Sequence, residues 1–341
     1  MKLPWSTKGI VLTAPLTEEI DDVVKLIDEY LAPRGFNMIV MQVRYRYRFK
    51  HHPEVMGYDP LSYEDVKKLL AVCKKNGIRL IPKMNLIGHQ SGFPNEPTDG
   101  ILHGHNDPSS DIPDGFLRAY PDFDEQKGEK EILYARSICL SSRPAKIVLR
   151  ELIDELMDVF ESDWIHIGCD EAFNVGFCPE CAKKPKGELI AGWVNDINRH
   201  VKKRNGTVLV WGDRFLEASS TGYDRWEASD NGTHSALDAL EKDVILCDWH
   251  YNKYDAYPSI DVFGERGFEI FVSPWRDKEN LEAFLNYAML HDKGHIKGVL
   301  MTTWCGSGDL AKHLLYGEKG RWLHTDQIAS TIDDVFAEEN L

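Results

Sequence analysis

The chain alternates between short apolar runs rich in β-branched residues and longer amphipathic segments rich in Lys and Glu. The apolar runs predict eight strands, at residues 9–15, 37–44, 78–84, 164–170, 207–213, 244–250, 269–275 and 297–304. Segments such as "TEEIDDVVKLIDEYLAP" and "SYEDVKKLLAVCKKNG" predict helices between them, with Thr17 as N-cap of the first and Gly77 as C-cap of the second. Strands that alternate with helices indicate βα units and a parallel sheet.

Eight such units in 341 residues favour an α/β fold, a single (β/α)8 TIM barrel that spans residues 1–341. The competing fold is a doubly wound sheet. Its support is weak, because the first strand-to-helix turn, "TAPLTEE", lacks the glycine-rich phosphate loop of dinucleotide-binding proteins.

Two segments do not follow the repeat. Residues 87–142, after the third strand, are rich in Gly, Pro, Asp and His. We interpret this long loop as a substrate-shaping loop, with a solvated insertion as the alternative. Residues 316–341 are expected to form a C-terminal helical extension, packed on the barrel or on a second subunit, so a homodimer stays open.

Charge and composition limit the classes of binding partner that we expect. A net charge of −15 argues against nucleic acid and anionic membrane surfaces, and no apolar run is long enough to span a membrane. The start of the chain shows no signal-peptide pattern and the seven cysteines are scattered, so we expect a cytoplasmic protein with reduced thiols. The basic run "RYRYRFKHH" (44–52) is either an exposed loop or a grip on a polar or anionic substrate group.

Cysteine and histidine could indicate metal sites. Cys178 and Cys181 form a C-x-x-C motif, but a structural zinc site usually has two further ligands at recognisable spacing, and the sequence shows no second pair. A metal or redox pair stays open beside a plain turn into a helix. His89, His103 and His105 in the long loop lack tight ligand spacing, so we predict no metal and no cofactor.

The carboxyl ends of the strands share one face in such a barrel. They carry Gln42, Arg44, Asn85, His89, Asp170, Glu171, Trp211, Asp213, Asp248, Trp249, Tyr251, Trp275, Arg276 and Trp304. Any single Trp there can close the barrel core. Four of them favour a sugar site, because sugar C–H faces stack on aromatic rings and hydroxyls bond to polar side chains.

The adjacent carboxylates end the fourth predicted strand. Strand alternation points Asp170 into the barrel mouth, while Glu171 lies at the rim, so the two groups approach a sugar from different angles. An ordinary retaining glycosidase needs two carboxyls about 5 Å apart that flank the scissile bond. Neighbours suit another division of labour, in which one carboxyl is the general acid and the substrate supplies the nucleophile.

The stretch "HIGCDE" (166–171) resembles the His-x-Gly-x-Asp-Glu signature of the family 20 glycoside hydrolases, the β-N-acetylhexosaminidases. "PKMNLIGH" (82–89), "VLVWGD" and "LMTTW" are also similar to the family, and the chain looks most like the hexosaminidase D type. The resemblance covers about residues 9–315. It implies a single catalytic domain, exo-acting on terminal β-linked GalNAc or GlcNAc, with retention and with the substrate's 2-acetamido group as nucleophile.

The resemblance also implies roles for individual residues. Glu171 is the general acid and then the base, and Asp170 orients the acetamido N–H and stabilises the oxazolinium. Tyr251 donates to the acetamido oxygen, His89 supports Asp170, and the pocket walls are Trp211, Trp249 and Trp304.

Three positions depart from the family pattern. No Arg ends strand one, no Asp follows strand two, and Gly306 replaces a Glu. The candidate substitutes for binding the outer hydroxyls are Arg44, Asp213 and Asp309.

Other functions remain open. One is a related barrel glycosidase on a modified or internal 2-acetamido sugar, and another is a non-catalytic sugar-binding barrel. A third is a metal-dependent hydrolase that uses His89, His103 and Asp170. The expected partner of the protein is a small-molecule or glycan substrate that bears a 2-acetamido sugar.

Overall fold

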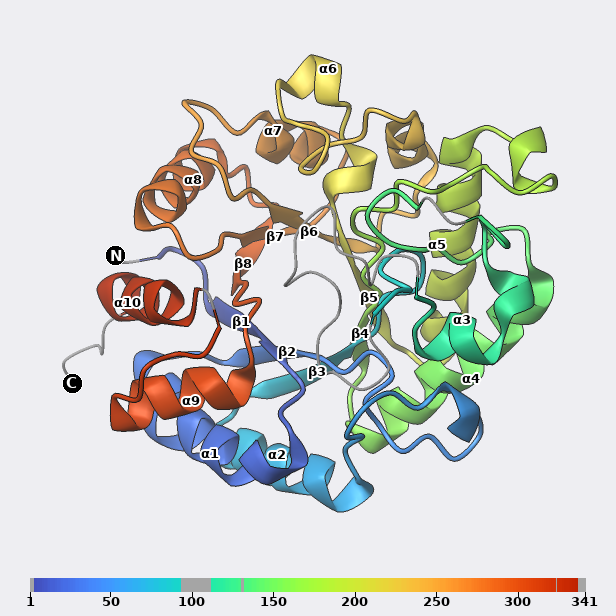
Figure 1. Cartoon of the computed structure of the whole chain (residues 1–341). Helices are drawn as coiled ribbons and strands as arrows, with labels where there is room; N and C mark the ends of the chain where they lie inside the picture. Colours follow the sequence, from blue (N-terminus) through green and yellow to red (C-terminus); the bar gives the residue numbers. More distant parts are fainter. Residues whose placement is uncertain (1–2, 93–111, 130–131, 323, 337–341) are drawn as a thin grey trace. The chain divides into compact units, whose positions relative to one another are not determined.

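The computed structural model describes residues 3–92, 112–129, 132–322 and 324–336. Within them, eight strands are hydrogen-bonded in the order β1 to β8 and close into a barrel (Figure 1). The strands are β1 (Thr7–Thr13), β2 (Met38–Gln42), β3 (Arg79–Lys83), β4 (Trp164–His166), β5 (Thr207–Trp211), β6 (Ile245–Trp249), β7 (Ile270–Ser273) and β8 (Ile296–Met301). Pairs such as β1–β2 and β1–β8 are parallel, so the predicted (β/α)8 barrel is confirmed.

Helices separate the strands along the chain. They are α1 (Ile20–Lys25), α2 (Tyr63–Lys75), α3 (Gly115–Ala119), α4 (Arg143–Val159), α5 (Lys186–Lys202), α6 (Ala218–Thr221), α7 (Pro258–Glu265), α8 (Lys278–His291), α9 (Ser307–Tyr316) and α10 (Thr325–Val335). In α4, Ser142 caps the first turn by accepting a hydrogen bond from the Ala145 N–H, and the buried face includes Leu149 and Leu156. None of the helices in the described ranges is long and apolar enough to cross a membrane.

The two predicted helix caps differ in outcome. Gly77 ends α2 in the left-handed conformation, and the Ile78 N–H donates to the Cys73 carbonyl at 2.8 Å, as in a Schellman motif. This prediction is confirmed. Thr17 is the first residue of a 3-10 turn that precedes α1, and Leu16 holds the cap position, so the predicted N-cap is wrong.

The chain divides into two compact units. The first comprises residues 1–43, 61–82 and 246–341, and the second comprises residues 44–60 and 83–245. In the first unit, α9 contacts both α1 and α10 (Figure 1). Ile328 and Ile332 of α10 are buried, and the Phe336 ring lies 5.2 Å from that of Phe36. The described part of the 316–341 extension therefore packs on its own chain.

The basic run 44–52 lies in the second unit. Its aromatic side chains Tyr45, Tyr47 and Phe49 are buried, whereas Arg48 is exposed. The Tyr45 hydroxyl donates to Gln90 Oε1 at 2.6 Å. The run is thus neither a plain exposed loop nor a basic grip, because its aromatic residues anchor it in the core.

Candidate active site

The chain leaves the extended conformation soon after β4. Gly168, Cys169 and Glu171 have φ values of 67°, 71° and 48°. A Cβ at Gly168 would lie 2.7 Å from Asn85 Cγ, so the turn requires glycine. Because the strand ends at His166, alternation does not decide where the two carboxylates point. The prediction that alternation separates them is wrong.

Instead, both carboxylates converge on His89. The imidazole Nε2 lies 3.1 Å from Asp170 Oδ2 and 3.3 Å from Glu171 Oε2. Neither contact has the geometry of a full hydrogen bond. Burial opposes the charge of the ring, but the negative charges of Asp170 and Glu171 outweigh it and raise the pKa of His89 to about 10. His89 is therefore a cation at neutral pH.

Asp170 is held as an anion. Asn85 Nδ2 donates to its Oδ1 at 2.6 Å, and only 5% of the residue is exposed. Burial opposes ionisation, but the charges of His89 and Lys83 lower the pKa of Asp170 well below its usual range. Asn85 also fixes the turn, because its Oδ1 accepts the Cys169 N–H at 3.1 Å.

No role was predicted for Lys83, and Asn85 was named only as one of the residues at the strand ends. Both lie in "PKMNLIGH", which supplied the resemblance, and the β3–β4 register places Lys83 opposite His166. Their position in that stretch was the signal that could have identified them.

Glu171 is more accessible than Asp170. Its side chain is 14% exposed, against 8% for that of Asp170. The Glu171 backbone N–H donates to Asp213 Oδ2 at 2.9 Å, and Arg214 Nε donates to the same oxygen at 2.7 Å. Burial and the charge of Asp170 raise the pKa of Asp213 to about 6, although Arg214 opposes the shift. This geometry gives Asp213 a positioning role beneath Glu171, in place of the predicted sugar contact.

Arg44 is also used within the protein. Its Nη2 lies 2.9 Å from Asp114 Oδ2 and donates to the carbonyls of His89 at 2.6 Å and Ser91 at 3.2 Å. Only 8% of the residue is exposed. Arg44 therefore holds the loop that carries His89, which corrects the predicted substrate contact.

Trp211 is completely buried and packs on His166, with ring centroids 4.4 Å apart. His166 Nδ1 accepts the Gly168 N–H at 3.0 Å, and burial, together with the charge of Lys83, lowers the pKa of His166 well below its usual value. The ring is neutral at pH 7. Trp211 thus closes the barrel core, which was the alternative role for any single Trp at a strand end. Its predicted role as a pocket wall is not supported.

The first unit holds a separate aromatic group, formed by Trp249, Tyr251, Trp275 and Trp304. Trp304 Nε1 donates to the Tyr251 hydroxyl at 2.6 Å. The Tyr251 ring lies 4.7 Å from that of Trp249 and 5.0 Å from that of Trp275. Tyr251 and Trp304 are only half-buried, so both keep surface for a ligand.

Asp309 lies in the same unit and has a structural role. Its carboxylate accepts the backbone N–H groups of Arg321 and Trp322 and the hydroxyl of Thr325. It fixes the connection between α9 and α10. The candidate role in binding hydroxyls is therefore not supported.

Backbone strain concentrates after the strands that carry these residues. Nine described non-glycine residues have positive φ, and five of them are Arg44, His89, Cys169, Glu171 and Trp304. Such conformations cost free energy and cluster at functional sites. The strain thus marks the same strand ends that the sequence indicated.

His89, Asp170 and Glu171 could also hold a metal ion, because one ligand atom from each lies within 4.8 Å of the others. A metal ion bound there would have to displace the proton of His89, because a metal ligand is deprotonated. The metal-dependent alternative also requires His103 as a ligand, and His103 lies outside the described residues.

Comparison with known proteins gives consistent matches. A model of the glycosyl hydrolase family 20 catalytic domain matches residues 39–312. A lacto-N-biosidase of Bifidobacterium bifidum is 20% identical over 263 residues, which are 73% of this chain and 20% of that protein. A β-hexosaminidase of Emericella nidulans is 22% identical over 225 residues, which are 62% of this chain and 32% of that protein. The chain thus spans a fifth to a third of the length of these relatives.

Solved structures agree on the fold. The chitobiase of Flavobacterium johnsoniae has a TM-score of 0.65 at 16% identity, with coverage of 96% of this chain and 48% of that one. A β-N-acetylglucosaminidase from Vibrio harveyi, solved with N-acetylglucosamine, has a TM-score of 0.63 at 14% identity, with coverage of 97% and 57%. At these identities the likeness shows the fold alone.

Proposed function

Because this chain belongs to glycosyl hydrolase family 20, we propose that it is an exo-acting β-N-acetylhexosaminidase that removes terminal β-linked GalNAc or GlcNAc. One observation carries the proposal. Two adjacent carboxylates meet one histidine cation, yet Asp170 is buried and ionised while Glu171 is more accessible. Carboxylates in unlike environments take unlike roles, which is how acid and base are separated in a site.

The proposed reaction uses the substrate's own acetamido group. Its carbonyl oxygen attacks C1 while Glu171 protonates the leaving oxygen, and this forms an oxazolinium ion. Asp170, fixed as an anion by Asn85 and His89, accepts the acetamido N–H and stabilises the positive charge that develops. Glu171 then activates water, which restores the starting state with retained configuration.

We propose sugar-binding roles for the aromatic group as well. The family resemblance assigns Tyr251 to the acetamido oxygen and Trp249 and Trp304 to the ring faces. Their clustering, with the Trp304–Tyr251 hydrogen bond at 2.6 Å, supports a preformed aromatic surface. Tyr251→Phe is expected to lower kcat more than it raises KM, because the Tyr251 hydroxyl would hold the acetamido oxygen in position for attack on C1.

A longer substrate is the second candidate. The relative named lacto-N-biosidase carries a name that denotes a biose, a two-sugar unit. An internal or modified 2-acetamido sugar would use the same Asp170–Glu171 chemistry. The two candidates differ in whether a single 2-acetamido sugar or a disaccharide is released.

The test is a panel of p-nitrophenyl β-glycosides of GalNAc, GlcNAc, glucose and a 2-acetamido disaccharide. We expect hydrolysis of the GalNAc or GlcNAc glycoside, none of the glucoside, and inhibition by a thiazoline analogue of the oxazolinium. Glu171→Gln should lower kcat/KM about 10²- to 10⁴-fold, with a smaller loss for an aglycone that is a better leaving group. Glu265→Gln, an exposed carboxylate on α7, is the matched control.

Several results would contradict the proposal. Hydrolysis of the glucoside at a similar rate would exclude acetamido participation. Sugar binding without turnover of any substrate would indicate a binding barrel. The metal-dependent alternative would be supported if activity required a metal ion and if Asp170→Asn lost both the activity and the metal bound beside His89.

A further inference from the structure

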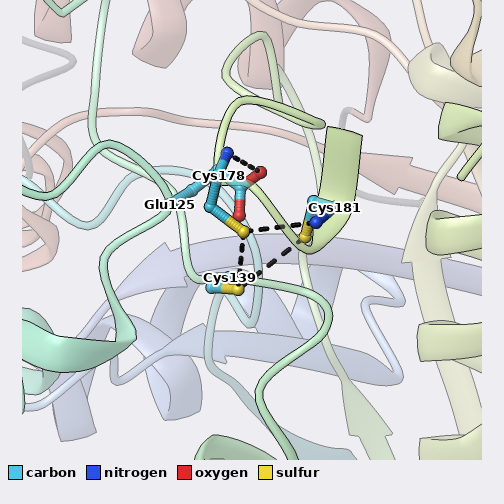
Figure 2. A group of neighbouring side chains, drawn as sticks. All are labelled: Glu125, Cys139, Cys178 and Cys181. Atoms are coloured by element: carbon cyan, nitrogen blue, oxygen red, sulfur yellow. Dashed lines mark hydrogen bonds between the residues drawn. The ribbon is translucent and has the colours of Figure 1, made fainter. Parts of the chain in front are cut away.

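A second chemical cluster lies away from the acidic pair. Cys178 and Cys181, the C-x-x-C motif after β4, meet Cys139 from the end of the long loop after β3 (Figure 2). Cys139 Sγ lies 3.4 Å from Cys178 Sγ and 3.7 Å from Cys181 Sγ. Glu125, also from the long loop, completes the group, and one ligand atom from each residue lies within 4.8 Å of the others. All four residues belong to the second unit.

Glu125 points to a ligand that is not a protein group. Only 2% of the residue is exposed. Its Oε1 accepts the backbone N–H groups of Gly176, Phe177 and Cys178 at 2.9, 2.8 and 3.2 Å. Its Oε2 is buried and meets no hydrogen-bond donor at ordinary geometry, with the Cys181 thiol, a weak donor, as its interacting neighbour. A buried carboxylate oxygen of this kind is costly unless a partner such as a cation binds it.

We propose that Glu125, Cys139, Cys178 and Cys181 bind one zinc ion. Zinc prefers four tetrahedral ligands and binds thiolates at about 2.3 Å, which places sulfur atoms about 3.8 Å apart. The two Sγ distances given above are close to this separation. A disulfide would instead require about 2 Å and would pair only two of the three cysteines. Four protein ligands leave no open position, so the ion is structural and not catalytic.

The zinc ion would fix the segment that follows the acidic pair. Residues 176–181 come five residues after Glu171, and the ion ties them to the long loop at Glu125 and Cys139. Asn174 strengthens the same connection, because its Nδ2 donates to the carbonyls of Leu133 at 2.9 Å and Ala135 at 2.5 Å. The site thus joins the chain after β4 to the described end of the loop after β3. It does not depend on the function proposed above.

The first experiment measures metal in the full chain, purified under reducing conditions with zinc present. Elemental analysis should find about one zinc per chain. Replacement by cobalt should give a thiolate-to-cobalt charge-transfer band and the intense visible bands of a tetrahedral site. Substoichiometric zinc, a cobalt spectrum without thiolate bands, or a disulfide in the intact mass would overturn the proposal. These readouts need no variant to fold.

Variants then locate the ion. Cys139→Ser, Cys178→Ser and Cys181→Ser should each lose zinc, whereas Cys73→Ser, a buried cysteine on α2, should keep it. Glu125→Gln keeps an acceptor for the backbone N–H groups but should weaken zinc binding at least 10-fold in competition with a chelator. Zinc that persists in the three cysteine variants would place the ion elsewhere, for example at His89, and would refute this site.

Discussion

At the scale of single residues, the state of the acidic pair depends on one buried cation. His89 contacts two carboxylates within 3.3 Å, and its ring is only 4% exposed. Removing its charge would leave the buried Asp170 carboxylate with Lys83 as the remaining cation that lowers its pKa. The free energy of unfolding should therefore depend on pH through the protonation of His89.

We predict that the stabilising effect of His89 is lost in alkaline solution. Its folded-state pKa of about 10 lies above the unfolded value of about 6.5, so its contribution is complete below pH 6.5 and disappears as the pH rises through 10. Asp170 has the opposite sign, because its lowered pKa contributes stability that is present at neutral and alkaline pH and is lost only in acid. The difference in free energy of unfolding between wild type and His89→Gln, from urea titrations at pH 6, 8 and 10, should therefore fall steadily.

A suitable control is His324→Gln. Burial and Arg276 lower the pKa of His324 from its usual value of about 6.5, so the ring is neutral in both the folded and the unfolded protein between pH 8 and pH 10. The free energy of unfolding of His324→Gln should differ from that of wild type by the same amount throughout that pH range. A His89→Gln difference that is equally constant would show that His89 is not held as a cation.

At the scale of elements, the turn after β4 decides the geometry of the site. The β4 strand is only three residues long, and the turn that follows contains Gly168, Cys169 and Glu171 in the left-handed region. The sequence predicted the strand but extended it to residue 170. Local apolar pattern cannot show where a strand stops, because Ile167 and Cys169 are buried whether or not they are extended.

We predict that Gly168→Ala destabilises the protein by about 2–4 kcal/mol and lowers activity with it. A Cβ there would meet both the backbone and the side chain of Asn85, which holds Asp170. Gly192→Ala is the matched control, because Gly192 is exposed within α5 with nothing within 4 Å of its added Cβ. It should stabilise by about 0.5–1 kcal/mol. Denaturant unfolding of both variants is the measurement, and equal effects would contradict the role of the turn.

At the scale of the whole molecule, the two units are not separate lengths of chain. The chain crosses from one unit to the other at four points, and two of these fall inside strands, between Pro82 and Lys83 in β3 and between Ile245 and Leu246 in β6. No linker separates the units at either point. Residues of both units belong to the same strand at these points. Unfolding of one unit therefore disrupts a strand of the other.

We therefore predict one cooperative unfolding transition for the full chain. Far-UV circular dichroism and tryptophan fluorescence should give coincident curves in urea. The fluorescence signal reports on both units, because Trp193 and Trp211 lie in the second and Trp249 and Trp304 in the first. Two separated transitions would show that the units unfold independently.

The architecture and the candidate acidic pair could both be predicted from the amino-acid sequence. Eight apolar runs separated by amphipathic helices specify the barrel, because burial against a helix layer leaves a periodic pattern in any single chain. The acidic pair could be found in "HIGCDE" because all the residues of this motif are contiguous in the chain.

The residues that surround the acidic pair, and their partners, could not be predicted in this way and became visible in the folded chain. Arg44, Asp213 and Trp211 looked like sugar contacts until their buried partners were seen, because a sequence shows which groups are polar but not which partners bind them. The cluster of Glu125 and Cys139 with the C-x-x-C motif was equally hidden, because its ligands are up to 56 residues apart and carry no common spacing. Contacts between distant residues are created by folding, and they leave no periodic trace in one chain.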